Sequence, residues 1–300
     1  MVDIAPNGFA VAVTPAGQVI GDSNSEAFSW TQSRGLVYIG TLGGEDSDAR
    51  AVNPGGEVVG QSRLPDGSTM HAFRWIQGRG MVDLGTLGGS FSIARAVNPS
   101  GEIVGSSYTS GDAAEHAYLW TEKSGMVDLG TLGGAGSVAV AVSPSGQVVG
   151  ESDTADGDSD AFSWTAKGGM VDLGTLGGAG SAALAVNSSG DVIGWSLTAS
   201  GDEDAFFWSQ KAGMVDLGSL GGGGSYPYGL SASGQVVGES TTAGGAGHAF
   251  FWTEKGGMVD LGTLGGTFSR AQDINASGQV TGWSYLSGNS QVHAVLWSPN

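Results

Sequence analysis

The sequence predicts an all-β chain that folds as a seven-bladed β-propeller with four-stranded blades. Three observations predict it. Three short motifs recur in a fixed order along the 300 residues, and the third motif begins anew every 44 or 45 residues. Each repeat contains four short β-rich segments separated by glycine-rich turns, which is typical of a propeller blade. One repeat is split between the two ends of the chain.

The first motif, A-V-N-P-x-G-x-V-V-G-x-S, predicts a hairpin between the first and second strands of each blade. Proline two residues before glycine suits a type I turn that ends in a left-handed residue. The turn glycines are Gly17, Gly56, Gly101, Gly146, Gly190, Gly234 and Gly278, and the prolines are Pro15, Pro54, Pro99 and Pro144.

The second motif, (H/D/E)-A-F-x-W, predicts the third strand. Its tryptophans recur so regularly that we expect them in the core between blades. Its first position is His in four repeats and an acid in three, which predicts a structural hydrogen bond. These positions belong to different blades, so they should not converge on a metal ion. The residues are His71, His116, His248 and His293, with Glu26, Asp160 and Asp204.

The third motif, M-V-D-L-G-T-L-G-G, predicts the fourth strand and the passage to the next blade. It is missing after Trp297, and its remnant Met1–Ile4 opens the chain. An open solenoid would instead show polar capping units at its ends. We therefore expect residues 1–4 to complete the last blade and close the ring, which removes exposed sheet edges. The single predicted domain, 1–300, has blades at about residues 5–40, 45–85, 90–130, 135–174, 179–218, 223–262 and 267–297, the last completed by 1–4.

Composition restricts the classes of partner. Acidic residues number 29 against 11 basic ones, a net charge of −18, which argues against nucleic acid and anionic membranes because both need Lys and Arg to neutralise phosphate. No apolar run is long enough for membrane insertion. The chain has no cysteine, so it has no disulfide or thiol chemistry. It begins inside a repeat without a signal peptide, so we expect a mature or trimmed form.

The H-A-F-x-W, L-G-T-L-G-G and A-V-N-x-x-G-x-V-V-G signatures resemble the bacterial HAF repeat family of probable extracellular repeats, over essentially the whole chain. The resemblance implies a secreted or surface-exposed protein and assigns no catalytic residue. Blades one, four and five depart from the pattern by placing an acid where the family has His.

The candidate site consists of residues that break the repeat on the face formed by the D-to-A and B-to-C connections, where the strands of a blade are A to D in chain order. After V-V-G, blades four to seven read Glu151, Trp195, Glu239 and Trp283, and neighbouring loops add Tyr226, Tyr228, Phe268, Arg270 and Tyr285. Aromatic rings stack on sugar rings and carboxylates bond to hydroxyls, so we expect recognition of carbohydrate or a cell-surface polymer. Trp195 and Trp283 could instead fill space between blades.

Two other functions remain open. Glu151 and Glu239 could flank a polysaccharide as acid and base or nucleophile of a glycoside hydrolase, and Tyr228 with Arg270 could serve a lyase. The repeat could also be a structural module of a larger extracellular protein. We expect no cofactor, apart from calcium at the oxygen-rich loop with Asp153, Asp156 and Asp158, which could equally be a solvated acidic loop. Serine-nucleophile, phosphate-loop and zinc motifs are absent from the sequence.

Overall fold

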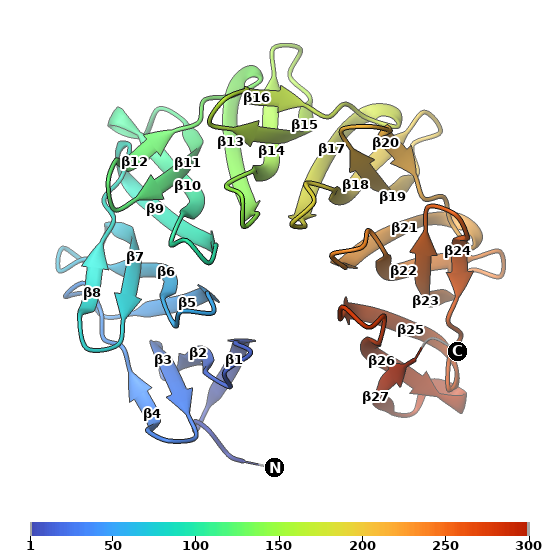
Figure 1. The fold of residues 1–300 in the computed structure, drawn as a ribbon, viewed down its shortest axis with the longest axis horizontal. Coiled ribbons are helices and arrows are strands. Elements are labelled where there is room, and N and C mark those ends of the chain that lie inside the picture. Colours follow the sequence, from blue (N-terminus) through green and yellow to red (C-terminus); the bar gives the residue numbers. More distant parts are fainter. Residues whose placement is uncertain (1, 299–300) are drawn as a thin grey trace. The chain divides into compact units, whose positions relative to one another are not determined.

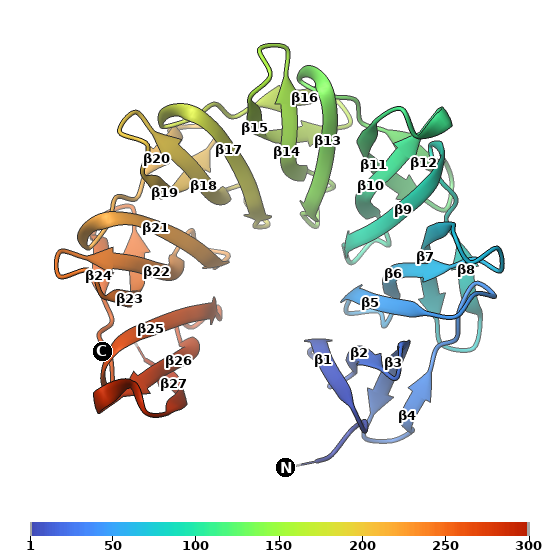
Figure 2. The same ribbon diagram turned by 180° about the vertical axis from the view of Figure 1, so that it is seen from behind.

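The computed structural model of the protein describes residues 2–298. Their regular secondary structure consists of β-strands and two single-turn 3-10 helices, Ser110–Asp112 and Ser287–Asn289. The strands are grouped into successive blades along the chain (Figures 1 and 2), and the chain divides into two compact units, residues 1–148 with 164–170 and residues 149–163 with 171–300. Among the residues that the structure describes, no helix is long and apolar enough to cross a membrane.

The first unit contains three complete blades in which each strand pairs antiparallel with the next. Blade one is β1 (Gly8–Val13), β2 (Val19–Ser23), β3 (Glu26–Thr31) and β4 (Gly35–Tyr38). Blade two is β5 (Ser47–Val52), β6 (Val58–Arg63), β7 (Met70–Ile76) and β8 (Gly80–Asp83). Blade three is β9 (Gly88–Val97), β10 (Ile103–Thr109), β11 (Glu115–Thr121) and β12 (Gly125–Asp128), and β13 (Gly133–Val142) follows.

The second unit contains the same antiparallel blades. Blade five is β17 (Gly177–Val186), β18 (Val192–Thr198), β19 (Glu203–Ser209) and β20 (Gly213–Asp216). Blade six is β21 (Gly221–Leu230), β22 (Val236–Thr242), β23 (Gly247–Thr253) and β24 (Gly257–Asp260), and blade seven has β25 (Gly265–Ile274), β26 (Val280–Leu286) and β27 (Val292–Trp297). The boundary between the units runs through the fourth repeat, which supplies β14 (Val148–Thr154), β15 (Ser159–Thr165) and β16 (Gly169–Asp172). The predicted all-β propeller fold is confirmed.

The start of the chain differs from its expected form. Residues 2–5 are not part of any strand, and Met1 lies outside the described residues. The first unit leaves an apolar row on β1 exposed, with Phe9 80% and Val13 66% accessible. An extended segment forms a β-strand only when a neighbouring strand pairs with it through backbone hydrogen bonds. The closing strand at residues 1–4 therefore stays a prediction.

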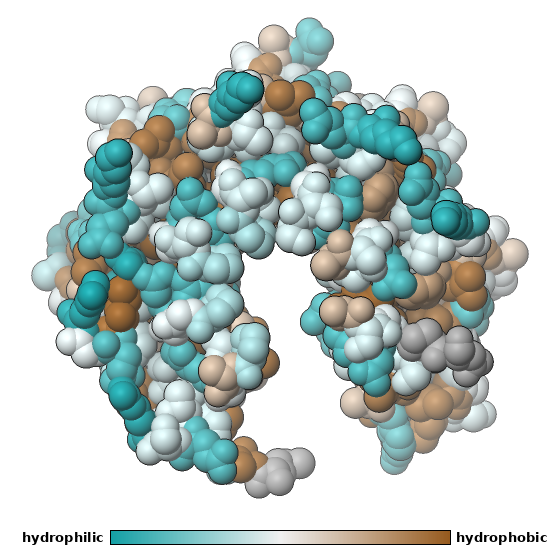
Figure 3. Space-filling view, viewed as in Figure 1, coloured by the Kyte–Doolittle hydropathy of each residue, from teal (hydrophilic) through white to brown (hydrophobic). Residues whose placement is uncertain are grey.

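The hydrophobic core lies between successive blades. Trp75 packs with Ile20, Ala49 and Phe73 from blades one and two, and the same kind of cluster recurs between blades five and six. Of the motif tryptophans, Trp75, Trp120 and Trp252 are buried as their regular spacing predicts, whereas the other four are half-buried, namely Trp30, Trp164, Trp208 and Trp297. The aromatic residue two places earlier is buried still more completely, since the largest fully buried side chains are Tyr118, Phe28, Phe73, Phe162, Phe206 and Phe250. The visible surface of each unit is hydrophilic to neutral, with apolar residues in scattered groups (Figure 3).

One serine in each A strand from blade two to blade seven, here called the bridging serine, connects a blade to the blade before it. Its Oγ accepts a hydrogen bond from the third-strand Ala N of the preceding blade at 2.8–3.0 Å and donates one to a linker Gly carbonyl at 2.6–2.8 Å. The bridging serines are Ser47, Ser92, Ser137, Ser181, Ser225 and Ser269. These bonds satisfy the N–H of a buried alanine and the carbonyl of a half-buried linker glycine, which would otherwise lack these partners.

The glycine of the V-V-G segment allows close approach of two strands. A Cβ on Gly60 would lie 1.9 Å from the carbonyl oxygen of Asp48, and one on Gly238 would lie 2.0 Å from that of Tyr226. The register of strands A and B shifts beside this contact, as in a β-bulge. The motif therefore keeps glycine because no side chain fits there.

In blades two, three and six the histidine that opens the second motif makes the predicted structural hydrogen bond, and its partner is the fourth-strand aspartate. His71 Nδ1 lies 2.9 Å from Asp83 Oδ1, and the His116–Asp128 and His248–Asp260 pairs repeat this contact at 2.8 Å. In blade one Tyr38 replaces the aspartate, and Glu26 Oε1 instead accepts the Gly40 N–H at 3.1 Å.

Blades four and five place two carboxylates where other blades pair His with Asp. Asp160 and Asp204 each keep one buried Oδ1 without a hydrogen-bond partner in the described residues. Burial raises the pKa of both carboxyls, and the nearby charges of Asp172 and Asp216 raise these pKa values further. The two substitutions therefore weaken these blades when the acids are ionised.

Candidate functional site

The second unit brings seven of the nine predicted ligand-binding residues into one connected cluster on blades six and seven. The cluster consists of Tyr226 and Tyr228 on β21, Glu239 on β22, Phe268 and Arg270 on β25, and Trp283 and Tyr285 on β26. All seven side chains are half-buried. None of these residue types recurs at its position throughout the repeat, so the cluster is built from departures from the repeat.

An ion pair lies at the centre of the cluster. Arg270 Nε donates to Glu239 Oε2 at 2.7 Å and Nη2 donates to Oε1 at 3.1 Å, while the Tyr228 hydroxyl donates to Oε1 at 3.2 Å. Burial opposes the charge of Arg270, but the hydrogen bonds and charge of Glu239 outweigh it and raise the pKa of the guanidinium. Burial followed by the charge of Glu239 raises the pKa of Tyr228 to about 12. The carboxylate of Glu239 is therefore held in place with both oxygens engaged.

Aromatic rings surround the guanidinium of Arg270. Its Cζ lies 4.7 Å from the ring centroid of Tyr228 and 5.5 Å from that of Trp283, distances at which a cation is attracted to the ring face. Trp283 also stacks on Phe268, with centroids 5.2 Å apart and an interplanar angle of 19°. Trp283 thus supports Phe268 from within the same blade.

A pocket of about 310 Å³ opens beside this cluster, on the predicted face. Its lining includes Tyr226 and Glu239 from blade six, Phe268 from blade seven and Glu203 from blade five. Gly247 makes room for it, because a Cβ there would lie 2.5 Å from the Phe268 ring. The equivalent residue in blade two is Met70, paired with Phe91. The aromatic wall of the pocket therefore depends on a glycine peculiar to blade six.

The negative charges around the pocket act on its tyrosine. Burial raises the pKa of Tyr226, and the charges of Glu203 and then Glu151 raise it further. Glu203 is solvent-exposed at the start of β19. The sequence places Glu203 in the acidic B-to-C loop of blade five on the candidate face, where three consecutive acids, Asp202 to Asp204, precede Ala205.

The other two predicted residues lie outside the lining. Trp195 on β18 is half-buried and, among the described residues, makes no ring contact with the cluster. Glu151 on β14 is half-buried and affects the site through its charge on Tyr226. Of the predicted catalytic pair Glu151 and Glu239, only Glu239 borders the pocket, and its carboxylate is bonded to Arg270 and Tyr228.

The acidic loop between β14 and β15 is a tight turn, in which Thr154 N donates to Asp158 O at 2.8 Å. Asp156 and Asp158 are exposed, and Asp153 is half-buried. In residues 2–298 no group of three or more His, Asp or Glu side chains is placed to hold a metal ion. The structure thus does not assemble the calcium candidates into a cation site.

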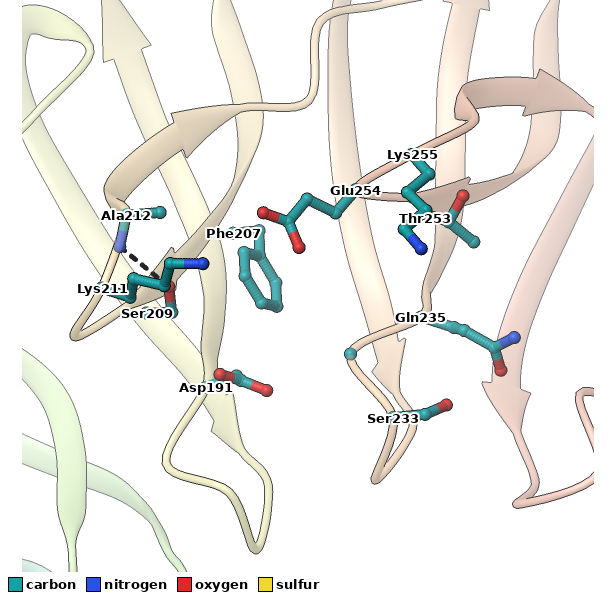
Figure 4. A pocket seen from close by; sticks show the side chains of 11 residues that line it. Asp191, Phe207, Ser209, Lys211, Ala212, Ser233, Gln235, Thr253, Glu254 and Lys255 are labelled. Atoms are coloured by element: carbon teal, nitrogen blue, oxygen red, sulfur yellow. Dashed lines mark hydrogen bonds between the residues drawn. The ribbon is translucent and has the colours of Figure 1, made fainter.

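A larger pocket of about 660 Å³ lies between blades five and six, at the A–B and C–D turns (Figure 4). Lys211 and Lys255 border it together with Asp191 and Glu254, and Phe207 lies between them but is only 7% exposed. This pocket was not predicted from the sequence, although the lysines recur every 44 residues as Lys123, Lys167, Lys211 and Lys255. Because its basic residues belong to the repeat, this pocket is less distinctive than the one beside Phe268.

No protein-family model and no curated protein matches the chain, so the resemblance to HAF repeats stays a prediction. Three solved structures are similar. A puromycin hydrolase mutant complexed with PGG has a TM-score of 0.57 at 15% identity, covering 98% of this chain and 52% of that one. A prolyl endopeptidase has a TM-score of 0.57 at 10% identity, covering 97% and 50%. The β-propeller domain of the Trilobed protease from Pyrococcus furiosus has a TM-score of 0.54 at 8% identity, covering 98% and 97%.

These similarities establish the β-propeller fold and nothing finer, because the identities are low. The chain spans about half the length of the hydrolase and of the endopeptidase.

Proposed function

We propose that this protein is a secreted or surface-exposed recognition propeller that binds carbohydrate in the pocket beside Phe268. The observation that carries the proposal is the lining itself, in which two aromatic side chains, Tyr226 and Phe268, stand beside two carboxylates, Glu203 and Glu239. Apolar faces with a few placed polar groups characterise small-ligand sites. A sugar ring offers C–H groups to aromatic faces and hydroxyls to carboxylates.

The rigidity of the cluster supports binding. Phe268 stacks on Trp283 and lies so close to Gly247 that no side chain would fit there. Tyr226 packs on Tyr228 with ring centroids 5.1 Å apart. Rings that are already positioned lose little conformational entropy when a ligand binds. The pocket of about 310 Å³ is at the small end of ligand sites, which fits one or two sugar units.

Binding is tested by calorimetry of the whole chain with a panel of neutral, amino and acidic oligosaccharides. Phe268→Ala should weaken the affinity for a bound sugar about tenfold, since it removes a stacking ring. Phe91→Ala, the same change at the equivalent position of blade three, is the matched control and should leave the affinity unchanged. If no sugar binds, or if both variants bind like wild type, the carbohydrate proposal is wrong.

The enzymatic alternative has its own assay. Release of reducing ends or unsaturated products from polysaccharides, compared between wild type, Glu151→Gln and Glu239→Gln, measures hydrolase or lyase activity. We expect no release from wild type, because Glu239 is engaged by Arg270 and Tyr228. Release that disappears in either variant would replace the recognition function by catalysis.

A further inference from the structure

The pocket beside Phe268 has an unbalanced charge. No Lys, Arg or His is among its lining residues, which include the two carboxylates of Glu203 and Glu239. The charge of Glu239 is compensated by Arg270, which contacts both of its oxygens. In the described part of the chain, no side chain forms a hydrogen bond or ion pair with the Glu203 carboxylate. One uncompensated negative charge therefore borders the pocket.

Other acids strengthen this negative potential. The Asp202 Oδ1 atom lies 3.3 Å from where a Cβ on Gly223 would be, and Gly223 is part of the pocket wall. Burial raises the pKa of the Tyr226 phenol, and the charges of Glu203 and Glu151 raise it further, in keeping with the acids around this wall. Lys and Arg are scarce in the whole chain, with 11 against 29 acids, so distant charge does not reverse this sign.

The aromatic wall is suited to the same charge. Phe268 and Tyr226 both line the pocket, and the negative face of an aromatic ring attracts a cation placed over it. Aromatic rings combined with carboxylates are suited to binding ammonium groups. An ammonium group loses its water when it enters a pocket, and a lone carboxylate does not offset that cost, so the attraction to the ring faces adds the remaining stabilisation.

We propose that the pocket selects a carbohydrate with a free, protonated amine, that is, an amino sugar, in preference to neutral, N-acetylated or acidic sugars. This inference rests on the proposed function and names its ligand class. The ammonium group lies between Glu203 and the faces of Tyr226 and Phe268, and the remaining hydroxyls meet the polar groups of Ser240 and Thr241 in the lining. An acidic sugar is repelled, whereas a neutral sugar gains only the stacking contribution.

The experiment compares two ligands that differ only at nitrogen, the β-1,4-linked glucosamine tetramer and its fully N-acetylated counterpart. Calorimetric affinities are measured at pH 6 for wild type, Glu203→Gln and Glu254→Gln, at ionic strengths of about 0.05 M and about 0.5 M. Glu254 is an exposed acid of blade six at the other pocket, so its variant makes the same charge change away from the proposed site. Phe268→Ala is measured in parallel.

We expect wild type to bind the amine tetramer about tenfold more tightly than the acetylated one at low salt, with the ratio falling at high salt. Glu203→Gln should weaken amine binding about fivefold and leave the acetylated tetramer unchanged, and Glu254→Gln should change neither. Equal affinity for the two tetramers, or equal effects of the two Gln variants, overturns the amine inference while the carbohydrate function stands. Failure of every sugar in the panel to bind overturns both proposals.

Discussion

Removal of one bridging serine tests how successive blades are connected. In Ser92→Ala the Ala72 N–H loses its acceptor at 2.8 Å and the Gly85 carbonyl loses its donor at 2.6 Å. Ser92 and Ala72 are both 0% exposed, so water cannot reach the N–H without a structural opening. An unsatisfied buried donor costs about 1–3 kcal/mol and a lost net hydrogen bond about 0.5–1.5 kcal/mol. We therefore expect Ser92→Ala to lower the free energy of unfolding by about 2–4 kcal/mol.

The assay is guanidinium unfolding followed by tryptophan fluorescence, with the slope m compared to ensure that the same surface unfolds. Ser124→Ala is the control, because this exposed serine bonds only within its own turn and its loss should cost less than about 0.5 kcal/mol. If Ser92→Ala and Ser124→Ala cost the same, the bridging bonds contribute nothing net and the reasoning is wrong.

Three further changes test other features. Asp204→His should raise the unfolding free energy by about 1 kcal/mol, because an imidazole then opposes Asp216 as His248 opposes Asp260; denaturant midpoints measure the gain, and a loss would contradict it. Burial raises the pKa of Asp204 in the folded state, so its ionisation destabilises the fold above that pKa and has no effect below 3.8. Asp204→Asn should therefore stabilise the protein by up to about 1 kcal/mol at pH 7, and its Tm should converge with that of wild type as the pH falls to about 3. A gain in Tm that does not depend on pH would refute the assignment. Gly60→Ala should destabilise by about 3 kcal/mol through the contact with Asp48, whereas Gly244→Ala, whose Cβ meets no atom closer than 3.9 Å, should be neutral in thermal unfolding, and equal effects would exclude the steric explanation.

Much of the fold could be predicted from the sequence because residues with a structural role recur at equivalent positions of the seven repeats. A residue that recurs every 44 or 45 positions, such as Trp75, occupies an equivalent place in each blade. A large apolar residue at such a place is expected to pack between blades, as Trp75 does. The hydrogen bond of His71 was predicted for the same reason. Its partner Asp83 was not, because pairing across two strands depends on register, and the motifs alone do not state which acid faces which base.

The candidate site was predicted only in part. Departures from the repeat indicated Tyr226 and Phe268, and the structure places both in the lining of one pocket. The sequence did not reveal that Arg270 pairs with Glu239, because the two residues are 31 positions apart and belong to different blades. It also did not reveal the role of Gly247, which leaves room for the Phe268 ring because it has no side chain.

The bridging serines have a consequence for how such a chain can lengthen or shorten. Each bond joins the N–H of an alanine in one repeat to the Oγ of a serine 20 residues later in the next repeat. A duplicated segment of one period therefore contains both a donor alanine and an acceptor serine. Copying of whole periods therefore needs no compensating change, whereas a deletion that removes one serine leaves a neighbouring blade with an unsatisfied amide. The first A strand has Gly8 in place of the serine, so it brings no hydroxyl to any strand that precedes it. Gene duplication can thus extend this architecture from within more readily than from its first blade.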